Sequence, residues 1–542
     1  MHFKNNKQNH SRIIYFVINC ILWAFILSLV WGGSHLVTGS PYVEDFKVLS
    51  DPVSEAISYR VFANITSSLH KTDTKFLSLT IDTYDLRYNW EEFFFKSKKL
   101  HNLAAALSPS DLRFGGTYSD FLTFDPTATH FTENNLLKNI RRAYQIDFGI
   151  FNRRFTIEEF TMSGSQWSSL NTFIEEVGWD LLYDVNLFKW NDGMWDPTNL
   201  ELLLDYSSES GFKIPYFQLG NEPNTYPHNF NVTIPPETLT ADLLALKAVL
   251  SKYPLYKDSS LFGPDVTNLN VPHRSVQYLS EFITAGAYNV VSGITLHHYY
   301  MNGKTAVQMD FLNLTIMNSM KRELELAVNI AATSPIPLPI SITETSTCFA
   351  GGAPGLSDSY IGSFLWLDKL GLSAQYGVAR VFRQTFLGTP DGLLADNMNP
   401  NPDFYLSVLF KKLIEGPVFN VSIDPQDENL RIYIHCARRK LYKAGAIVIY
   451  YLNVQANEAI LDFPQFQDAD LDLYLFTPGD DGLISRHFRL NNELVLMPHA
   501  SLPPLRPQPH KGKVTVSPVS FGFIVIRNAN VQLCIKHFAH QK

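Results

Sequence analysis

The stretch IPYFQLGNEPN, residues 214–224, joins a short apolar run to an acid that is followed at once by a proline. Residues 214–220 have the aromatic and β-branched content of a buried strand. Pro223 fixes its own φ and disfavours helical geometry at Glu222, so the chain is not expected to pass directly from strand to helix. The stretch therefore predicts a strand whose end holds a carboxylate in a fixed place.

Seven further runs of this kind surround the first, and longer amphipathic stretches such as 240–253 and 359–377 lie between most of them. The predicted strands are 75–82, 111–116, 179–187, 214–220, 260–265, 290–300, 338–344 and 378–386. Eight strands in βα alternation predict an α/β fold, a (β/α)8 TIM barrel over residues 75–414. A doubly wound sheet is the alternative, but no G-x-G-x-x-G follows a strand here.

From about residue 415 the pattern changes to closely spaced strand-like runs without amphipathic helices. These runs are 418–424, 430–437, 446–454, 471–478, 493–497 and 520–527. They predict a β-sandwich over residues 415–542. The region 40–74 contributes one strand-like run at 57–65, which is expected to join this sheet. The polar segment 127–160 is either a surface excursion or a linker removed by proteolysis, which would leave a two-chain heterodimer.

The first 39 residues are typical of a targeting segment. Basic residues precede an uncharged apolar run at 13–30, and small residues follow it. The segment is read as a secretory signal peptide, with an uncleaved signal anchor in the membrane as the alternative. The chain is therefore expected to be secreted, extracellular or lysosomal. Four N-x-S/T tripeptides agree with this route and predict glycosylation at Asn64, Asn231, Asn313 and Asn420.

Charge and cysteine content exclude several classes of function. The formal net charge of −8 gives no general attraction to nucleic acid. No His/Cys cluster has zinc spacing, so neither a metal nor a cofactor is predicted. In an oxidising compartment Cys436 and Cys534 could bridge, while Cys348 is expected to be a small buried apolar residue.

Two glutamates stand where a barrel enzyme carries its chemistry. Glu222 follows the fourth predicted strand and Glu344 ends the seventh, and barrel active sites lie at the carboxyl ends of the strands. Hydrolysis of a glycoside needs two carboxyl groups, one protonated to donate to the leaving oxygen and one ionised to attack the anomeric carbon. Taken singly each glutamate is an ordinary surface acid, but their joint placement predicts a glycosidase.

Long segments resemble glycoside hydrolase family 79, the family of the heparanases, within the retaining clan of (β/α)8 glycosidases. They include QLGNEPN, LSPSDLRFGGTYSDFLTFDP, LHHYYMNGKTA, ETSTCFAGGAPGLSD and PDFYLSVLFKKL. The resemblance implies a retaining endo-β-glucuronidase that cleaves glucuronosyl linkages in heparan sulfate or a related, less sulfated glycan. It makes Glu222 the proton donor and Glu344 the nucleophile, and it implies a disulfide between Cys436 and Cys534. The implied substrate-binding residues are Asn221, Asp82, Thr117, His297, Tyr299, Lys304, Arg274, Gly351 and Gln384.

The departures from the family pattern concern substrate charge. The family's heparan-sulfate-cleaving members carry two basic clusters beside the cleft, but here 157–169 has two acids and no Lys or Arg. In 270–282 only His273 and Arg274 remain, and Lys304 stands where the family has an arginine. The alternatives are therefore an inactive or weakly active protein that binds glycosaminoglycan, and an exo-β-glucuronidase.

Overall fold

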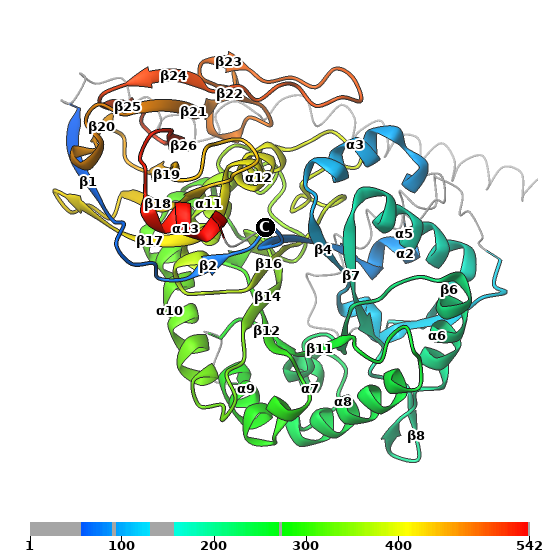
Figure 1. The fold of residues 1–542 in the computed structure, drawn as a ribbon. Helices are drawn as coiled ribbons and strands as arrows, with labels where there is room; N and C mark the ends of the chain where they lie inside the picture. The colour runs from blue at the N-terminus through cyan, green and yellow to red at the C-terminus, as the bar shows by residue number, and fades with distance from the viewer. Residues whose placement is uncertain (1–55, 89–93, 130–156, 270–273, 540–542) are drawn as a thin grey trace, which may run out of the picture. The chain divides into compact units, whose positions relative to one another are not determined.

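A computed structural model describes residues 56–88, 94–129, 157–269 and 274–539, and it places 56–542 in one compact unit (Figure 1). The targeting segment and residues 130–156 of the predicted excursion lie outside the described residues. Among the helices that the structure describes, none is both long and apolar enough to cross a membrane.

The first layer of the fold is a closed barrel of eight parallel strands, as predicted. The barrel strands are β3 (Leu77–Asp82), β4 (Ser110–Gly115), β7 (Trp179–Val185), β10 (Tyr216–Leu219), β11 (Ser260–Val266), β12 (Gly293–His298), β14 (Ile340–Thr345) and β16 (Arg380–Arg383). Each overlaps one of the eight predicted runs. The barrel closes where β16 pairs with β3, with Val381 opposite Leu77.

Helices follow the barrel strands in turn and pack around the outside of the barrel (Figure 1). They are α2 (Thr83–Tyr88), α3 (Lys98–Ala106), α5 (Gly164–Val177), α6 (Thr198–Ser210), α8 (Pro236–Ser251), α9 (Arg274–Thr284), α10 (Leu314–Ala331), α11 (Gly362–Gln375) and α12 (Pro402–Leu413). Apolar residues face the strands and polar residues face outward on most of them, which is the sequence pattern that predicted them.

The second layer is a twelve-stranded sheet that includes the early strand, as predicted. Its strands are β1 (Ile57–Asn64), β2 (Lys71–Thr72), β17 (Ile414–Asp424), β18 (Leu430–Ala437), β19 (Ile447–Asn453), β20 (Ala459–Asp462), β21 (Asp470–Pro478), β22 (Phe488–Leu490), β23 (Glu493–Leu494), β24 (Gln508–Lys511), β25 (Val514–Val516) and β26 (Ser520–Ile526). β1 lies between β17 and β20, antiparallel to the first and parallel to the second.

The sheet forms a sandwich because it folds over on itself, so that β1, β20 and β25 pack against one face of β19, and its other face is also buried. Along β19, Ile447, Ile449 and alternate neighbours face β1, β20 and β25 in one core, while Val448 and Tyr450 face the barrel helices in the other. Burial on both faces explains why the segment 446–454 is an almost unbroken apolar run. α11 fits closely beneath β18, since a Cβ on Gly371 would lie 2.5 Å from the ring of Tyr433.

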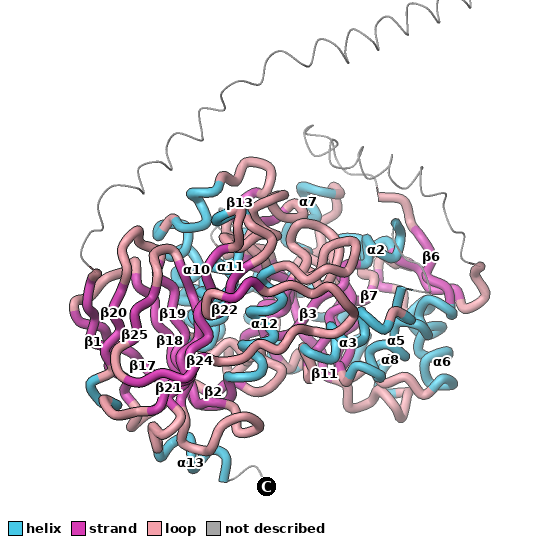
Figure 2. Tube along the Cα trace, turned by 90° about the horizontal axis from the view of Figure 1, so that it is seen from above, coloured by secondary structure: helices cyan, strands magenta, loops and turns pink. Residues whose placement is uncertain are grey.

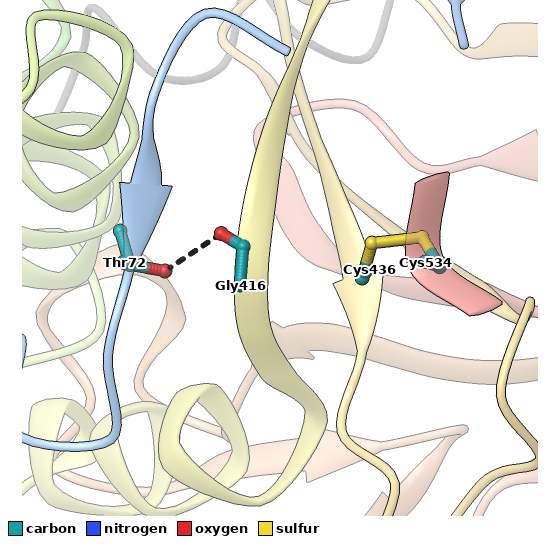
Figure 3. The surroundings of a disulfide bond; sticks show 4 residues. All are labelled: Thr72, Gly416, Cys436 and Cys534. Carbon is teal, nitrogen blue, oxygen red and sulfur yellow. Dashed lines mark hydrogen bonds between the residues drawn. A yellow bond between two sulfur atoms is a disulfide. The ribbon is translucent and has the colours of Figure 1, made fainter. Parts of the chain in front are cut away.

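A disulfide ties the end of the chain to this sheet. Cys436 of β18 is bonded to Cys534 of α13 (Gln532–Ala539), as the family resemblance implied (Figure 3). Beside it, β2 is bound to β17 through the Thr72 hydroxyl, which donates to the carbonyl of Gly416 at 3.4 Å. Cys348 is a free, buried thiol, as predicted.

Candidate active site

Glu222 ends the turn that follows β10. Its backbone has φ 56° and ψ 52°, in the left-handed region, and Pro223 then begins the short 3-10 helix η4 (Pro223–Thr225). Gly220 precedes it with φ 80°, and a Cβ there would lie 2.6 Å from the side chain of Leu187. The backbone N–H of Glu222 donates to the carbonyl of Asp265 at 3.1 Å. The strand therefore stops abruptly and presents the carboxylate at the barrel mouth.

Glu344 approaches the same point from β14. In the register of β12 and β14, His297 lies directly opposite Glu344. Nδ1 of His297 is 2.7 Å from Oε1 of Glu222 and 3.9 Å from Oε2 of Glu344. One carboxylate oxygen of Glu222, one ring nitrogen of His297 and one carboxylate oxygen of Glu344 all lie within 4.8 Å of one another. The structure thus brings the two predicted catalytic carboxylates together.

Two donors hold Glu344 on its two oxygens. The hydroxyl of Tyr299 donates to Oε1 at 2.7 Å, and Nη1 of Arg113 donates to Oε2 at 3.1 Å. Burial and the charge of Glu344 raise the pKa of Tyr299, so this phenol stays protonated and remains a donor. These two hydrogen bonds fix the orientation of the Glu344 carboxyl group.

Arg113 of β4 is the centre of the buried polar network under the two glutamates. Its guanidinium donates hydrogen bonds of 2.6–3.1 Å to Gln218, Asn221, Asp184, Asp265 and Glu344. Burial alone would lower the pKa of Arg113, but the carboxylates around it raise that pKa above its ordinary value. The planar guanidinium provides fixed donors in several directions, which a lysine could not replace.

His297 is held as a cation by Asp265. Nε2 of His297 lies 3.0 Å from Oδ2 of Asp265. Burial opposes protonation, but the charges of Asp265 and Glu344 raise the pKa of His297 to about 10. Burial would likewise raise the pKa of Asp265, yet Arg113 and His297 bring it below its usual range. The imidazolium therefore points a proton at Glu222 throughout the neutral range.

The surroundings of Glu222 favour the protonated form of its carboxyl group. Burial raises its pKa, the hydrogen bond from His297 partly offsets this, and the charge of Glu344 raises the pKa again. The side chain is 22% exposed and that of Glu344 13%, so both reach the mouth from a largely buried setting. Glu222 is thus a buried carboxyl group beside a second carboxyl group, an environment that helps it to keep its proton.

Asn221 is fixed at both its side chain and its backbone. Its Oδ1 accepts from Arg113 at 2.7 Å, and its backbone N–H donates to the hydroxyl of Tyr226 at 3.0 Å and to Oδ2 of Asp120 at 3.3 Å. The Tyr226 hydroxyl itself donates to Oδ2 of Asp120 at 2.5 Å. With its oxygen engaged, Asn221 keeps its amide N–H groups for a ligand in the cleft.

Asp82, Gln384 and Thr117 form a second corner of the mouth. Nε2 of Gln384 donates to Oδ2 of Asp82 at 2.9 Å. Thr117 follows Gly116, where a Cβ would lie 2.8 Å from the carboxylate of Asp82. Burial and the charge of Glu344 raise the pKa of Asp82 to about 7. Asp82 and Gln384 are therefore brought together near Glu344, and Thr117 follows the glycine that packs against Asp82.

Comparison with known proteins identifies the family. The model "Glycosyl hydrolase family 79, N-terminal domain" matches residues 61–371, more than half of the chain. The chain is also 35% identical over 519 residues to heparanase from Bos taurus, covering 89% of this chain and 94% of that protein. The chain belongs to glycoside hydrolase family 79.

Proteins similar to this chain carry names that differ in activity. The human protein called inactive heparanase-2 is 29% identical over 517 residues, which covers 85% of this chain and 86% of that protein. A solved 4-O-α-L-rhamnosyl-β-D-glucuronidase from Fusarium oxysporum 12S superposes with a TM-score of 0.60 at 13% identity, covering 87% of this chain and 100% of that one. The latter likeness concerns the fold alone.

The rim of this family 79 site carries the remaining predicted residues. The two short strands β13 (Met301–Asn302) and β15 (Cys348–Phe349) pair and bring the loops of Lys304 and Gly351 side by side. Both residues are exposed, and Gly351 has φ 82°. Arg274 begins α9 and is also exposed, but no described contact joins it to the two glutamates.

Sequence reasoning missed four residues of this family 79 site: Arg113, Asp265, Asp120 and Tyr226. Arg113 and Asp265 lie in the predicted strands 111–116 and 260–265, at positions expected to be apolar. A charged residue inside a buried strand is rare unless it is paired, and this signal was available for both. The position of Tyr226 gave no such signal, because a tyrosine in a turn is common.

Proposed function

We propose that this protein is a retaining endo-β-glucuronidase that cleaves glucuronosyl linkages in heparan sulfate or a less sulfated related glycan. The observation that carries the proposal is the approach of the Glu222 and Glu344 oxygens within 4.8 Å. Retaining glycosidases place their two carboxyl groups about 5–5.5 Å apart, whereas inverting enzymes leave about 6.5–9.5 Å for a water.

In this mechanism Glu222 donates a proton to the leaving glycosidic oxygen. Its raised pKa keeps the proton available, and the bond from His297 to Oε1 leaves Oε2 to face the substrate. After the leaving group departs, the same carboxylate accepts a proton from water. His297, as a cation, stabilises the carboxylate that forms at this point.

Glu344 attacks the anomeric carbon and forms a covalent glycosyl-enzyme. Tyr299 and Arg113 hold the attacking carboxylate in one orientation, with one donor on each oxygen. Asn221 presents its amide N–H groups beside the pair, in a position suited to the hydroxyl next to the reacting carbon. Water then breaks the ester with Glu222 as base, so two inversions give overall retention.

Two relatives named as glucuronidases support the choice of sugar: the hyaluronoglucuronidase of Hirudo nipponia, 29% identical to this chain, and the baicalin-β-D-glucuronidase of Scutellaria baicalensis, 26% identical. The exposed Lys304 beside the Gly351 loop offers a cation for an acidic sugar at the rim. The sequence has no Lys or Arg at 157–169 and Arg274 alone at 270–282, which favours a glycan with few sulfates near the cleaved bond, because each sulfate left without a cation would cost affinity.

The proposal is tested with the purified protein on an aryl β-glucuronide, heparan sulfate and hyaluronan at pH 5 and pH 7. A 2-fluoro glucuronide inactivator should label Glu344, as shown by peptide mass. Glu344→Gln should reduce turnover at least about 1000-fold. Glu222→Gln should still form the glycosyl-enzyme from substrates with good leaving groups, seen as a burst of released phenol, but turnover should fall because the second step lacks its base. Absence of both turnover and labelling in folded protein would refute it.

The two alternatives give different results in the same experiment. An exo-β-glucuronidase releases single glucuronic acid residues and leaves no shortened internal fragments on size-exclusion analysis. A binding protein retains heparin without turnover, and Glu344→Gln then leaves its behaviour unchanged. The intact set of Glu222, Glu344, Tyr299 and Arg113 favours catalysis over the binding role.

A further inference from the structure

A group of exposed basic side chains lies in the β-sandwich, around the disulfide and far from the residues of the active site. The turn between β18 and β19 contains the sequence ARRKLYK, residues 437–443, in a chain whose formal net charge is −8. Arg439, Lys440 and Lys443 of this turn are exposed. Leu441, also exposed, is the one apolar residue at its tip.

Contacts with α13 and α12 extend this group beyond the turn. Nη1 of Arg439 donates to the carbonyl of Phe538 at 3.1 Å, which places the turn against α13 and its exposed Lys536. The backbone N–H of Arg438 donates to the carbonyl of Leu413 at 2.7 Å, at the end of α12 beside the exposed Lys412.

Strand β2 completes the group on the other side of α13. A Cβ on Gly416 would lie 2.5 Å from the ring of His537, and β2 pairs with β17 at the same glycine. Lys71 of β2 pairs with Pro417 of β17, next to this glycine, so Lys71 lies close to this end of α13. Burial and the charge of Lys71 lower the pKa of His537. The exposed cations that form this basic face are Lys71, Lys412, Arg439, Lys440, Lys443 and Lys536.

The acids near the basic face are already paired with other cations. Glu415 lies 3.6 Å from Arg438, Asp73 lies 2.7 Å from Arg380, and Asp472 lies 3.5 Å from Arg527. Within the described parts of the chain, none of the six cations of the basic face forms an ion pair with a carboxylate. The face therefore keeps its positive charge for a partner.

The basic face and the catalytic cleft lie on different sides of the molecule. Figure 2 shows α13 and β2 at the opposite end from β13 and α7 (Tyr226–Asn229), which belong to the mouth of the barrel. At the described mouth, the candidate cations at the rim are Lys304 and Arg274. Positive charge is thus sparse where the bond would be cleaved and gathered on the far side.

We infer that the basic face is a non-catalytic binding site for a sulfated polysaccharide chain. Its cations come from four separate segments and spread across a surface, which suits an extended polyanion. An anionic membrane is disfavoured because stable attachment to a bilayer also requires apolar insertion, and the turn offers Leu441 alone. The choice of glycan rests on the proposed function, but the site does not depend on catalysis.

The test compares two double charge reversals that change the net charge equally. Lys440→Glu with Lys443→Glu alters the basic face, and Lys247→Glu with Lys257→Glu alters exposed positions at and just after α8. Affinity for a size-defined heparin oligosaccharide is measured by anisotropy at several salt concentrations. The first variant should weaken binding about tenfold near physiological salt and flatten its salt dependence, because fewer counterions are exchanged.

A second variant, Lys412→Glu with Lys536→Glu, changes other segments of the same face and should have a similar effect. Activity on a small aryl β-glucuronide should stay within about twofold in all three variants. Equal heparin affinity in wild type and all variants would overturn the inference, as would loss of phosphatidylserine-vesicle binding without loss of heparin binding. Face-dependent heparin affinity in a protein without turnover would support the inference and contradict the proposed function.

Discussion

Tyr226→Phe removes one oxygen atom from the support beneath the candidate acid. The ring should keep its place, because it packs against Phe188 and Phe230 with centroids 4.7 and 5.8 Å away. What is lost is the hydroxyl that donates to Asp120 at 2.5 Å and accepts from the Asn221 N–H at 3.0 Å. The substitution therefore isolates the hydrogen bonds from the packing.

The free energy of unfolding that Tyr226→Phe loses depends on the charge of Asp120. Burial and the charge of Asp184 raise the pKa of Asp120 to about 8, and the bond from Tyr226 works against this rise. A carboxyl group whose folded pKa lies above its unfolded value destabilises the fold as pH rises from about 4 to 8. At pH 5 the variant loses a bond to a neutral acid, about 1 kcal/mol, and at pH 9 a bond to a carboxylate, about 2–3 kcal/mol.

Thermal unfolding at pH 5 and pH 9 measures this difference. With about 2.1 cal/mol/K of unfolding entropy per residue, a chain of this size shifts by roughly 1 °C per kcal/mol. Tyr256→Phe is the matched control, since its buried hydroxyl donates to the neutral carbonyl of Phe212 at 2.9 Å. The control should lose the same unfolding free energy, and so show the same shift in Tm, at both pH values. A pH-independent loss in Tyr226→Phe would refute the reasoning.

Three further predictions follow from the site and the disulfide. His297→Asn removes the hydrogen bond that lowers the pKa of Glu222. In a pH profile of kcat/KM, the fall on the alkaline side should therefore move to higher pH, and the maximum value should decrease. A fall at the same pH as in the wild type would contradict the assigned hydrogen bond. In the wild type, KM for an anionic substrate should rise as pH increases through about 7, because Asp82 becomes charged. Asp82→Asn should abolish this rise, as shown by comparing the pH profiles of KM of the two proteins. Cys436→Ala with Cys534→Ala should lower the unfolding free energy by about 2–5 kcal/mol, measured in denaturant, because the bond closes a loop of 98 residues.

The barrel was predictable because its strands are short, apolar and separated by amphipathic stretches. The run at 214–220 is an example, since buried parallel strands read as almost continuous hydrophobic segments. The strands β20, β24 and β25 were not predicted. They are short elements that contain polar residues, and their pairing depends on contacts across the sandwich that no local pattern records.

The site was predictable only in part, for a similar reason. Glu222 and Glu344 follow from strand order, because the carboxyl ends of all barrel strands meet at one mouth. Arg113 does not follow from it, because its importance lies in contacts with five side chains on other elements. Strand order predicts which end of the barrel a residue reaches, but it does not predict the direction of a side chain within a buried polar network.

The positions of the charges suggest how an acidic glycan is handled at different pH values. Near the proposed nucleophile, burial and the charge of Glu344 raise the pKa of Asp82 to about 7, so the mouth loses a negative charge below neutral pH and repels an anionic sugar less. Lysine and arginine side chains keep their charge through that range. Binding at the basic face should therefore change little between pH 5 and pH 7, while binding at the mouth strengthens as pH falls. A chain held at the basic face would then be cleaved mainly under acidic conditions, with retention and cleavage controlled by different groups.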